Sequence, residues 1–279
     1  MAAWKLADRT LKLERPLAAG IVNVTDDSMF AGARSGSPEA AIEDGLALAE
    51  AGFGMLDVGA VAARTGPPVP AEEETANLLP TIEGLSERTE LPISADTFSV
   101  PVAEAALRAG AVAINDISGA RDPALFELCA ETGAGLVLMQ LDGRPREDRD
   151  PPRREDVIEH LRAWFAERIE AALARELDER QLVLDPGLDF DLGVHDGLEV
   201  LRRLGELRSL GRPLYVSLSR KDLLGAALSG SWTERAPAEQ REWATAAAAA
   251  IAVENGADIL RLHDASALQA TQVAGAIRG

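Results

Sequence analysis

Eight short apolar runs recur along this chain, and each is followed by a longer run whose apolar residues have helical spacing. Short apolar runs are typical of buried strands, and periodic segments of about 10 to 20 residues are typical of helices. One such helix, 37–51, has a Ser-Pro-Glu start signal, and another, 236–255, is closed by Asn255-Gly256. The predicted strands are 17–25, 55–60, 92–97, 111–118, 135–140, 181–185, 213–219 and 259–264.

Several of these strands, such as 111–114 and 135–139, are apolar without alternation. Burial of both faces by crossover helices explains this pattern, and such crossovers join parallel strands. Eight consecutive strand-helix units in about 250 residues predict a single (β/α)8 TIM barrel. A doubly wound open sheet is the alternative, although no G-x-G-x-x-G follows the first strand to support it. Because no linker or break in composition divides the chain, we expect one domain over residues 1–279.

The composition restricts the partners of such a domain. Among 279 residues, 28 basic and 46 acidic side chains give a formal net charge of −18, which argues against a nucleic-acid partner. The N-terminus lacks the apolar core of a signal peptide, and no run approaches the ~18 uncharged apolar residues of a membrane span. The single cysteine, Cys129, lies on the apolar face of a predicted helix and is interpreted as a core residue. We therefore expect a cytoplasmic protein without a membrane partner.

Lysine is rare in this chain and occurs only at Lys5, Lys12 and Lys221, whereas arginine fills nearly every other basic position. The two residues are nearly equivalent as surface charges, so the skew indicates a bias of the coding sequence. Where one lysine persists in such a background, a requirement for a compact ammonium group is one explanation. Chance survival of Lys221 is the other.

Nearly every predicted strand ends in a polar residue. In a (β/α)8 barrel the chemistry lies at this end, because the loops that follow the strands converge on one pocket. Each residue alone has a plainer explanation, since Asp and Asn often form turns or cap helices and a lone histidine is often structural. Surface turns would not be expected to place the whole set on one rim. The residues at these strand ends are Asn23, Asp57, Asp96, Asn115, Asp116, Gln140, Asp185, Ser219, Lys221, Arg261 and His263.

Two groups within this set suit different parts of a ligand. Asp96, Asn115 and Asp185 suit the edge of a nitrogen heterocycle, because carboxylates accept hydrogen bonds from ring N–H and amino groups and an amide both donates and accepts. Arg261 and His263 alternate along one strand, so both side chains are expected to point to the same side at its end. Two cationic or donor groups there suit a phosphate or pyrophosphate.

Seven short motifs resemble those of dihydropteroate synthase, and they occur in that family's order along nearly the whole chain. The broader superfamily of pterin-binding barrels, which includes methyltetrahydrofolate-dependent corrinoid methyltransferases, shares some of them. The motifs are GIVNVTDDS at 20–28, DVG at 57–59, SADT at 94–97, INDISG at 114–119, DPG at 185–187, SRK at 219–221 and RLHD at 261–264.

This resemblance implies a transferase of folate biosynthesis that condenses 6-hydroxymethyl-7,8-dihydropterin pyrophosphate with p-aminobenzoate, giving 7,8-dihydropteroate and pyrophosphate. Breaking the C–O bond leaves cationic character on the pterin and an anionic leaving group, which preplaced charges and Mg²⁺ would stabilise. By position, the resemblance places around the pterin Asp96, Asn115, Asp185, Lys221 and Arg261. It places on the pyrophosphate Asn23, Arg261 and His263, with Asn23 acting through Mg²⁺. It places at the aminobenzoate Phe190 and Ser219.

The net charge should repel a pyrophosphate at long range. Binding is therefore expected to depend on a local cationic mouth of Arg64, Lys221, Arg261 and His263, helped by Mg²⁺ and acting within a Debye length of ~8 Å. Together with Asn23, these four residues are the candidate catalytic residues.

Four departures from the family's pattern fall in loops expected to close over substrate. At 60–66 the chain reads AVAARTG where the family has GESTRPG, so Arg64 is kept and the hydroxyl groups are lost. At 29–32 MFAG replaces FSDG, which removes a loop carboxylate. Gln140-Leu141 replaces His-Met, and Asp191-Leu192 stands where the family has Gly-Lys.

Three interpretations follow: an active but divergent dihydropteroate synthase, a paralogue that binds the pterin pyrophosphate but has lost or changed the second substrate, and another pterin-barrel transferase such as a methyltransferase. Against the last, His263 and Lys221 are better explained by a pyrophosphate and a ring oxygen than by a methyl donor. The resemblance also implies a homodimer formed through the last helices. The Ala-rich stretch 244–252 suits close packing there, although it equally suits a helix lying on the barrel.

Overall fold

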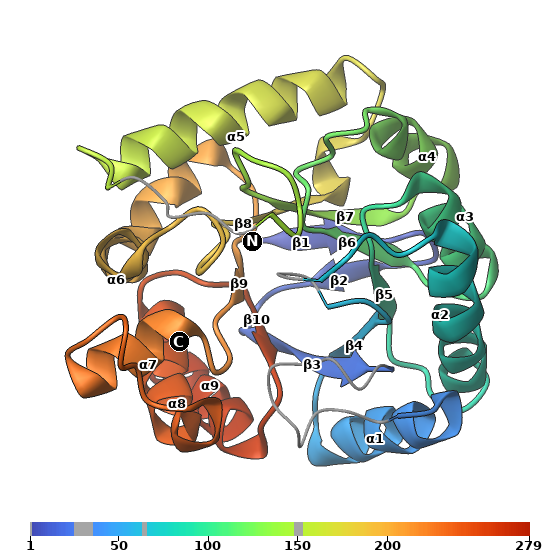
Figure 1. The fold of residues 1–279 in the computed structure, drawn as a ribbon. Coiled ribbons are helices and arrows are strands. Elements are labelled where there is room, and N and C mark those ends of the chain that lie inside the picture. The colour runs from blue at the N-terminus through green and yellow to red at the C-terminus, as the bar shows by residue number, and fades with distance from the viewer. Residues whose placement is uncertain (1, 25–35, 63–65, 148–152) are drawn as a thin grey trace.

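The structure is a computed structural model that describes residues 2–24, 36–62, 66–147 and 153–279. Within these ranges the main sheet has eight parallel strands in the order β8-β7-β6-β5-β4-β3-β10-β9. A parallel bridge between Leu184 and Leu214 brings the two ends of this order together and nearly closes the barrel. The helices form a ring around the strands (Figure 1). The predicted (β/α)8 TIM barrel is therefore confirmed, and the alternative, a doubly wound open sheet, is not what the chain forms.

Each barrel strand lies within one of the predicted runs, and the helices alternate with them. The strands are β3 (Leu17–Asn23), β4 (Met55–Gly59), β5 (Ile93–Asp96), β6 (Ala113–Asp116), β7 (Gly135–Met139), β8 (Leu182–Asp185), β9 (Tyr215–Ser217) and β10 (Ile259–Leu262). The helices are α1 (Pro38–Ala51), α2 (Ala71–Ser86), α3 (Val100–Arg108), α4 (Ala124–Thr132), α5 (Val157–Leu173), α6 (Val194–Arg203), α7 (Asp222–Ser229), α8 (Glu242–Glu254) and α9 (Ala265–Arg278), with 3-10 turns η2 (Glu179–Gln181), η3 (Leu204–Leu210) and η4 (Ala238–Gln240).

The predicted helix boundaries are confirmed for α1 and corrected for α8. The Ser37 side chain accepts a hydrogen bond from the Ala40 N–H at 3.3 Å and caps α1. The prediction that the later helix begins at residue 236 is wrong, because Pro237 is extended and only a 3-10 turn precedes α8. In the part of the chain that the structure describes, no helix is long and apolar enough to cross a membrane.

The large apolar core fills the layer between the barrel strands and the helices, and α4 contributes Cys129 to it. This cysteine is fully buried. Burial raises the pKa of the Cys129 thiol to about 12, so the thiolate does not form near neutral pH. The interpretation of Cys129 as a core residue is confirmed.

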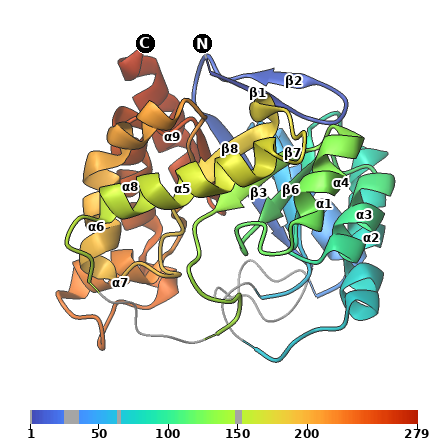
Figure 2. The ribbon, with the colours of Figure 1, turned by 90° about the horizontal axis from the view of Figure 1, so that it is seen from above.

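An N-terminal hairpin of β1 (Ala3–Lys5) and β2 (Thr10–Lys12) covers one end of the barrel, and the sequence did not predict it. Figure 2 shows this hairpin beside both chain termini, at the opposite end from α7. Trp4 is fully buried in a cluster with Met55, Val137 and Tyr215 from the barrel interior. Its indole N–H donates to the Gln181 carbonyl at 2.8 Å. The hairpin therefore covers the barrel interior at this end.

Candidate active site at the carboxyl ends of the barrel strands

The predicted polar residues gather at the carboxyl ends of the barrel strands, because parallel strands all end on the same side. Asn23, Asp96, Asp116 and Asp185 are the last residues of β3, β5, β6 and β8. Ser219 and Lys221 follow β9, and His263 follows β10. Arg64 and the first-loop residues 29–32 lie outside the described residues.

Asp57 of β4 is the centre of the site's polar floor, and it is fully buried. Its Oδ2 accepts hydrogen bonds from Arg261 Nε at 2.5 Å and from Asn115 Nδ2 at 3.0 Å. Its Oδ1 accepts from the Ser94 hydroxyl at 2.5 Å. The sequence placed Asp57 among the strand ends but gave it no role, since nothing local indicates a partner on the last strand.

Arg261 crosses the barrel interior from β10 and connects Asp57 with Asp96, whose Oδ2 accepts from Arg261 Nη2 at 2.6 Å. Burial opposes the charge of the guanidinium, but the two carboxylates outweigh it and hold the pKa of Arg261 above its ordinary range. Arg261 therefore stays cationic and is aimed at the floor of the pocket. His263, which lies two residues further along the chain, has a different partner.

Two carboxyl groups at the strand ends, Asp96 and Asp185, have pKa values above their ordinary range. Burial raises the pKa of Asp96 to about 7, with Arg261 and Lys221 opposing this shift and Asp57 adding to it. Burial also raises the pKa of Asp185 to about 6, although its Oδ1 accepts the Gly187 N–H at 2.8 Å. A carboxylate accepts hydrogen bonds from the N–H and amino groups of a heterocycle, and a protonated carboxyl group can also donate one.

An apolar wall stands beside the polar floor, and the sequence did not predict it. It consists of Ile117, Met139 and Leu141, against which Phe190 packs. The Lys221 Nζ lies 4.5 Å from the centroid of the Phe190 ring, within the range of a cation–π contact. The available signal was that Ile117 and Met139 also stand at strand ends, where apolar residues can face the pocket instead of the core.

Ser219 is the hydrogen-bond partner of His263, whose place in a cationic mouth stays a prediction. Its Nδ1 lies 2.9 Å from the Ser219 Oγ, and its backbone N–H donates to the same oxygen at 3.3 Å. Burial lowers the pKa of His263 to about 3, and the nearby Arg261, Arg220 and Lys221 lower it further. In the ligand-free structure His263 is therefore neutral and can form a hydrogen bond to an anion.

The described residues suit a magnesium ion only if a ligand shares its coordination. Among them, no group of three or more His, Cys, Asp or Glu side chains is arranged to hold a metal. Asn23 supplies one hard amide oxygen at the end of β3. Mg²⁺ commonly takes only one or two protein ligands and completes its shell with phosphate oxygens and water. Asn23 fits that kind of shared site.

Comparison with known proteins defines the class of this barrel. Residues 19–263 match the family model described as pterin binding enzyme. A dihydropteroate synthase from Synechocystis sp. is 34% identical, over 95% of this chain and 91% of the relative. The chain therefore belongs to the dihydropteroate synthase family, whose members are transferases of folate biosynthesis. The resemblance seen in the sequence is confirmed.

Solved structures of this family match the whole barrel. The dihydropteroate synthase of Xanthomonas albilineans with 4-aminobenzoic acid is 38% identical with a TM-score of 0.88, covering 100% of this chain and 99% of that one. The enzyme from the same organism in complex with 7,8-dihydropteroate is 37% identical with a TM-score of 0.83, covering 99% and 98%. Both similarities extend over the elements that carry the site.

Proposed function

We propose that the protein condenses 6-hydroxymethyl-7,8-dihydropterin pyrophosphate with p-aminobenzoate, giving 7,8-dihydropteroate and pyrophosphate. The observation that carries this proposal is the buried floor in which Arg261 connects Asp57 with Asp96. Phe190 and Lys221 lie over an apolar wall at the same end of the barrel. Family membership supports the same reaction, and solved relatives hold 4-aminobenzoic acid and 7,8-dihydropteroate.

In this reaction the amine nitrogen of p-aminobenzoate forms a C–N bond to the pterin methylene carbon. The C–O bond to pyrophosphate breaks with its electron pair on the oxygen, and the amine releases a proton. Asp96, Asn115 and Asp185 hold the pterin edge, and the two carboxylates oppose the positive charge that develops on the ring. Phe190 and Ser219 line the aminobenzoate site.

The leaving pyrophosphate is bound by groups at this end of the barrel. Lys221 and, from the barrel interior, Arg261 supply positive charge, and His263 supplies a hydrogen bond. Arg64, which lies outside the described residues, is proposed to add a further cation. Asn23 would hold Mg²⁺, which when bound neutralises charge on the leaving group.

We also propose that the chain is one domain over residues 1–279, acts in the cytoplasm and forms a homodimer through α8 and α9. Trp243 and Ile251 of α8 and Val273 and Ile277 of α9 are more than half exposed, and a second copy of this face would cover them. The single buried Cys129 suits a reducing compartment.

The deciding experiment is turnover by the purified protein with Mg²⁺ and both substrates, followed by detection of 7,8-dihydropteroate. Pterin pyrophosphate binding without product would favour the paralogue that has lost its second substrate. Lys221→Ala and Arg261→Ala should each weaken pterin pyrophosphate binding by at least ~1.5 kcal/mol, as expected for lost charge-assisted bonds. Unchanged affinity by calorimetry would remove both residues from the site.

A further inference from the structure

The loop after β8 contains a tight turn, Leu188–Leu192, with Phe190 at its middle. The Phe190 N–H donates to the Gly187 carbonyl at 3.1 Å. Asp189 has a φ of 65°, in the left-handed region that non-glycine residues seldom adopt. A residue stays in this conformation when its surroundings determine it, so the contacts of Asp189 need an explanation.

The Asp189 carboxylate connects this turn to the start of α7. It is only 2% exposed. Its Oδ1 accepts the Leu223 N–H at 3.0 Å, and its Oδ2 accepts the Asp222 N–H in a short hydrogen bond. The first N–H groups of a helix have no partner inside the helix, and no side chain of α7's own N-cap residue, Lys221, caps them. The turn therefore supplies the missing cap from outside.

Asp191, two residues later, connects the same turn to the loop after β7. This side chain is 3% exposed. A single oxygen, Oδ2, accepts the Gly143 N–H at 3.2 Å and the Asp142 N–H in a short hydrogen bond. Phe190 is thus flanked by two carboxylates that fasten its turn to both neighbouring loops.

We propose that Asp189 and Asp191 are positioning residues that hold Phe190 against Lys221 and so preorganise the p-aminobenzoate side of the pocket. This inference rests on the proposed function. The Asp189 bonds fix the helix start that directly follows Lys221, while the Asp191 bonds fix the loop that carries Leu141 of the apolar wall. Removal of either carboxylate leaves two backbone donors unsatisfied and frees the aromatic ring to take other positions.

The same contacts give a role to one of the four departures from the family's pattern. Asp191 stands where the family pattern has glycine, and its carboxylate makes two bonds that glycine cannot make. The altered loop is therefore fastened in place by its own side chains.

The test compares KM for p-aminobenzoate and kcat among four variants of the whole protein. Asp189→Gly removes the carboxylate and also relieves the left-handed φ, and Asp191→Ala removes the other carboxylate. Each should raise KM about tenfold while kcat stays within about twofold, because binding geometry is lost and the reacting groups are kept. Asp191→Asn should stay within about twofold of wild type, since one amide oxygen can accept both bonds. Asp189→Asn keeps one of its two acceptors and should fall between.

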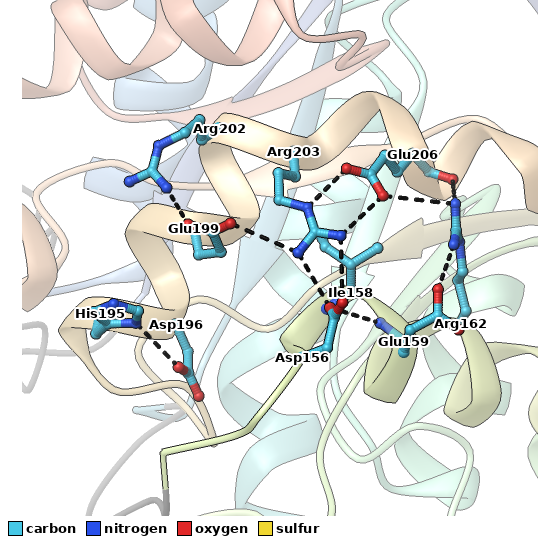
Figure 3. Close-up of polar contacts among 10 residues, drawn as sticks. All are labelled: Asp156, Ile158, Glu159, Arg162, His195, Asp196, Glu199, Arg202, Arg203 and Glu206. Carbon is cyan, nitrogen blue, oxygen red and sulfur yellow. Dashed lines mark hydrogen bonds and ion pairs between the residues drawn. The ribbon is translucent and has the colours of Figure 1, made fainter.

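Asp156 offers a matched control on the outer face of the barrel. Its Oδ1 accepts the N–H groups of Ile158 and Glu159 at 2.9 and 3.2 Å and so caps α5, and its carboxylate pairs with Arg203 (Figure 3). Asp156→Ala removes the same kind of carboxylate cap but touches no residue of the site. It should lower the unfolding temperature and leave KM unchanged.

An unchanged KM in Asp189→Gly and Asp191→Ala would overturn the proposal, as would an equal KM rise in Asp156→Ala. If Asp189→Gly fails to fold, the intermediate KM expected of Asp189→Asn decides; if Asp191→Ala fails to fold, the two Asp189 variants decide. If wild type binds pterin pyrophosphate but forms no product, the proposed function fails separately. The same variants are then compared by calorimetric Kd for p-aminobenzoate. A Kd about tenfold above that of wild type supports the positioning role. An equal Kd in variants and wild type, or no binding of p-aminobenzoate by wild type, refutes it.

Discussion

The buried carboxyl group of Asp185 is proposed to help bind the ligand, but its charge lowers the stability of the ligand-free protein. Burial raises the pKa of Asp185 to about 6. A carboxyl group with a raised folded-state pKa stabilises the protein below its unfolded pKa of about 3.9, and that contribution is lost as the pH rises through about 6. The ionised Asp185 therefore destabilises the ligand-free protein at neutral pH.

Asp185→Asn should stabilise the ligand-free protein by about 1–3 kcal/mol at pH 7.5, and its advantage should shrink toward about pH 4. The variant amide oxygen can still accept the Gly187 N–H, so local geometry is kept. Urea unfolding at both pH values measures this. Pterin pyrophosphate affinity should fall about tenfold in the same variant, because a charge-assisted acceptor is lost. Equal stability of variant and wild type at pH 7.5 would contradict the prediction.

His263 should remain neutral across the physiological range in the ligand-free protein. Burial and, to a smaller extent, the positive charge of Arg261 lower the pKa of His263 to about 3. Its ring resonances should therefore not titrate between about pH 5 and 8 in an NMR titration, unlike those of an ordinary histidine. Because this pKa lies below the unfolded value near 6.5, the associated stability is complete above about pH 6.5 and is lost as the pH falls toward 3. A midpoint near 6.5 would show that the ring is solvated.

The positions of the polar residues at the strand ends were predictable, but their interactions were not. Asp96, Asn115 and Asp185 could be assigned to one rim because each lies at or next to the end of a strand that the apolar pattern predicts. The bond between Asp57 and Arg261 joins positions 204 residues apart, so no local pattern indicates it. The neutrality of His263 depends on burial, which also requires the folded barrel.

At the scale of elements, the eight barrel strands followed from their apolar runs, and the N-terminal hairpin did not. Its strands have three residues each, and Lys5, Thr10 and Lys12 interrupt any apolar pattern. Trp4 becomes a core residue only because the barrel end beneath it needs a cover. The start of α8 was also missed, because an alanine-rich composition extends the helical pattern past Pro237.

Trp4→Ala should cost about 3–5 kcal/mol of unfolding free energy, because it empties a fully buried site and leaves the Gln181 carbonyl without the indole donor. Chemical denaturation of the two proteins measures the loss. KM for both substrates should stay near wild type, since the hairpin covers the end of the barrel opposite the site. A change in KM at unchanged stability would mean that the hairpin acts on the pocket.

At the scale of the whole molecule, the proposed homodimer is tested by placing charge on its apolar face. Ile277 is 76% exposed on α9, so Ile277→Glu should not disturb the core. It should convert a dimer to a monomer by light scattering, because a buried unpaired charge disfavours association. Leu173→Glu on α5 is the matched control, since Leu173 is also exposed but lies on another helix. A wild-type monomer would refute the proposed dimer.

β8 and β9 are paired over fewer positions than the other adjacent strands of the described barrel. In the described chain these neighbours share a single bridge, Leu184 to Leu214, whereas other adjacent barrel strands pair over three or more positions. Pro213 accepts the Leu184 N–H at 3.0 Å but has no N–H to return. This is therefore where the barrel should open most readily.

The two sides of the pocket lie on opposite sides of that junction. Asp185 and Phe190 follow β8, and Ser219 and Lys221 follow β9. A substrate bound by residues of both loops would connect β8 and β9 where the barrel has the fewest hydrogen bonds between strands. Amide exchange at Leu184, whose N–H donates to Pro213 across the junction, should accordingly slow more on ligand binding than exchange elsewhere in the barrel.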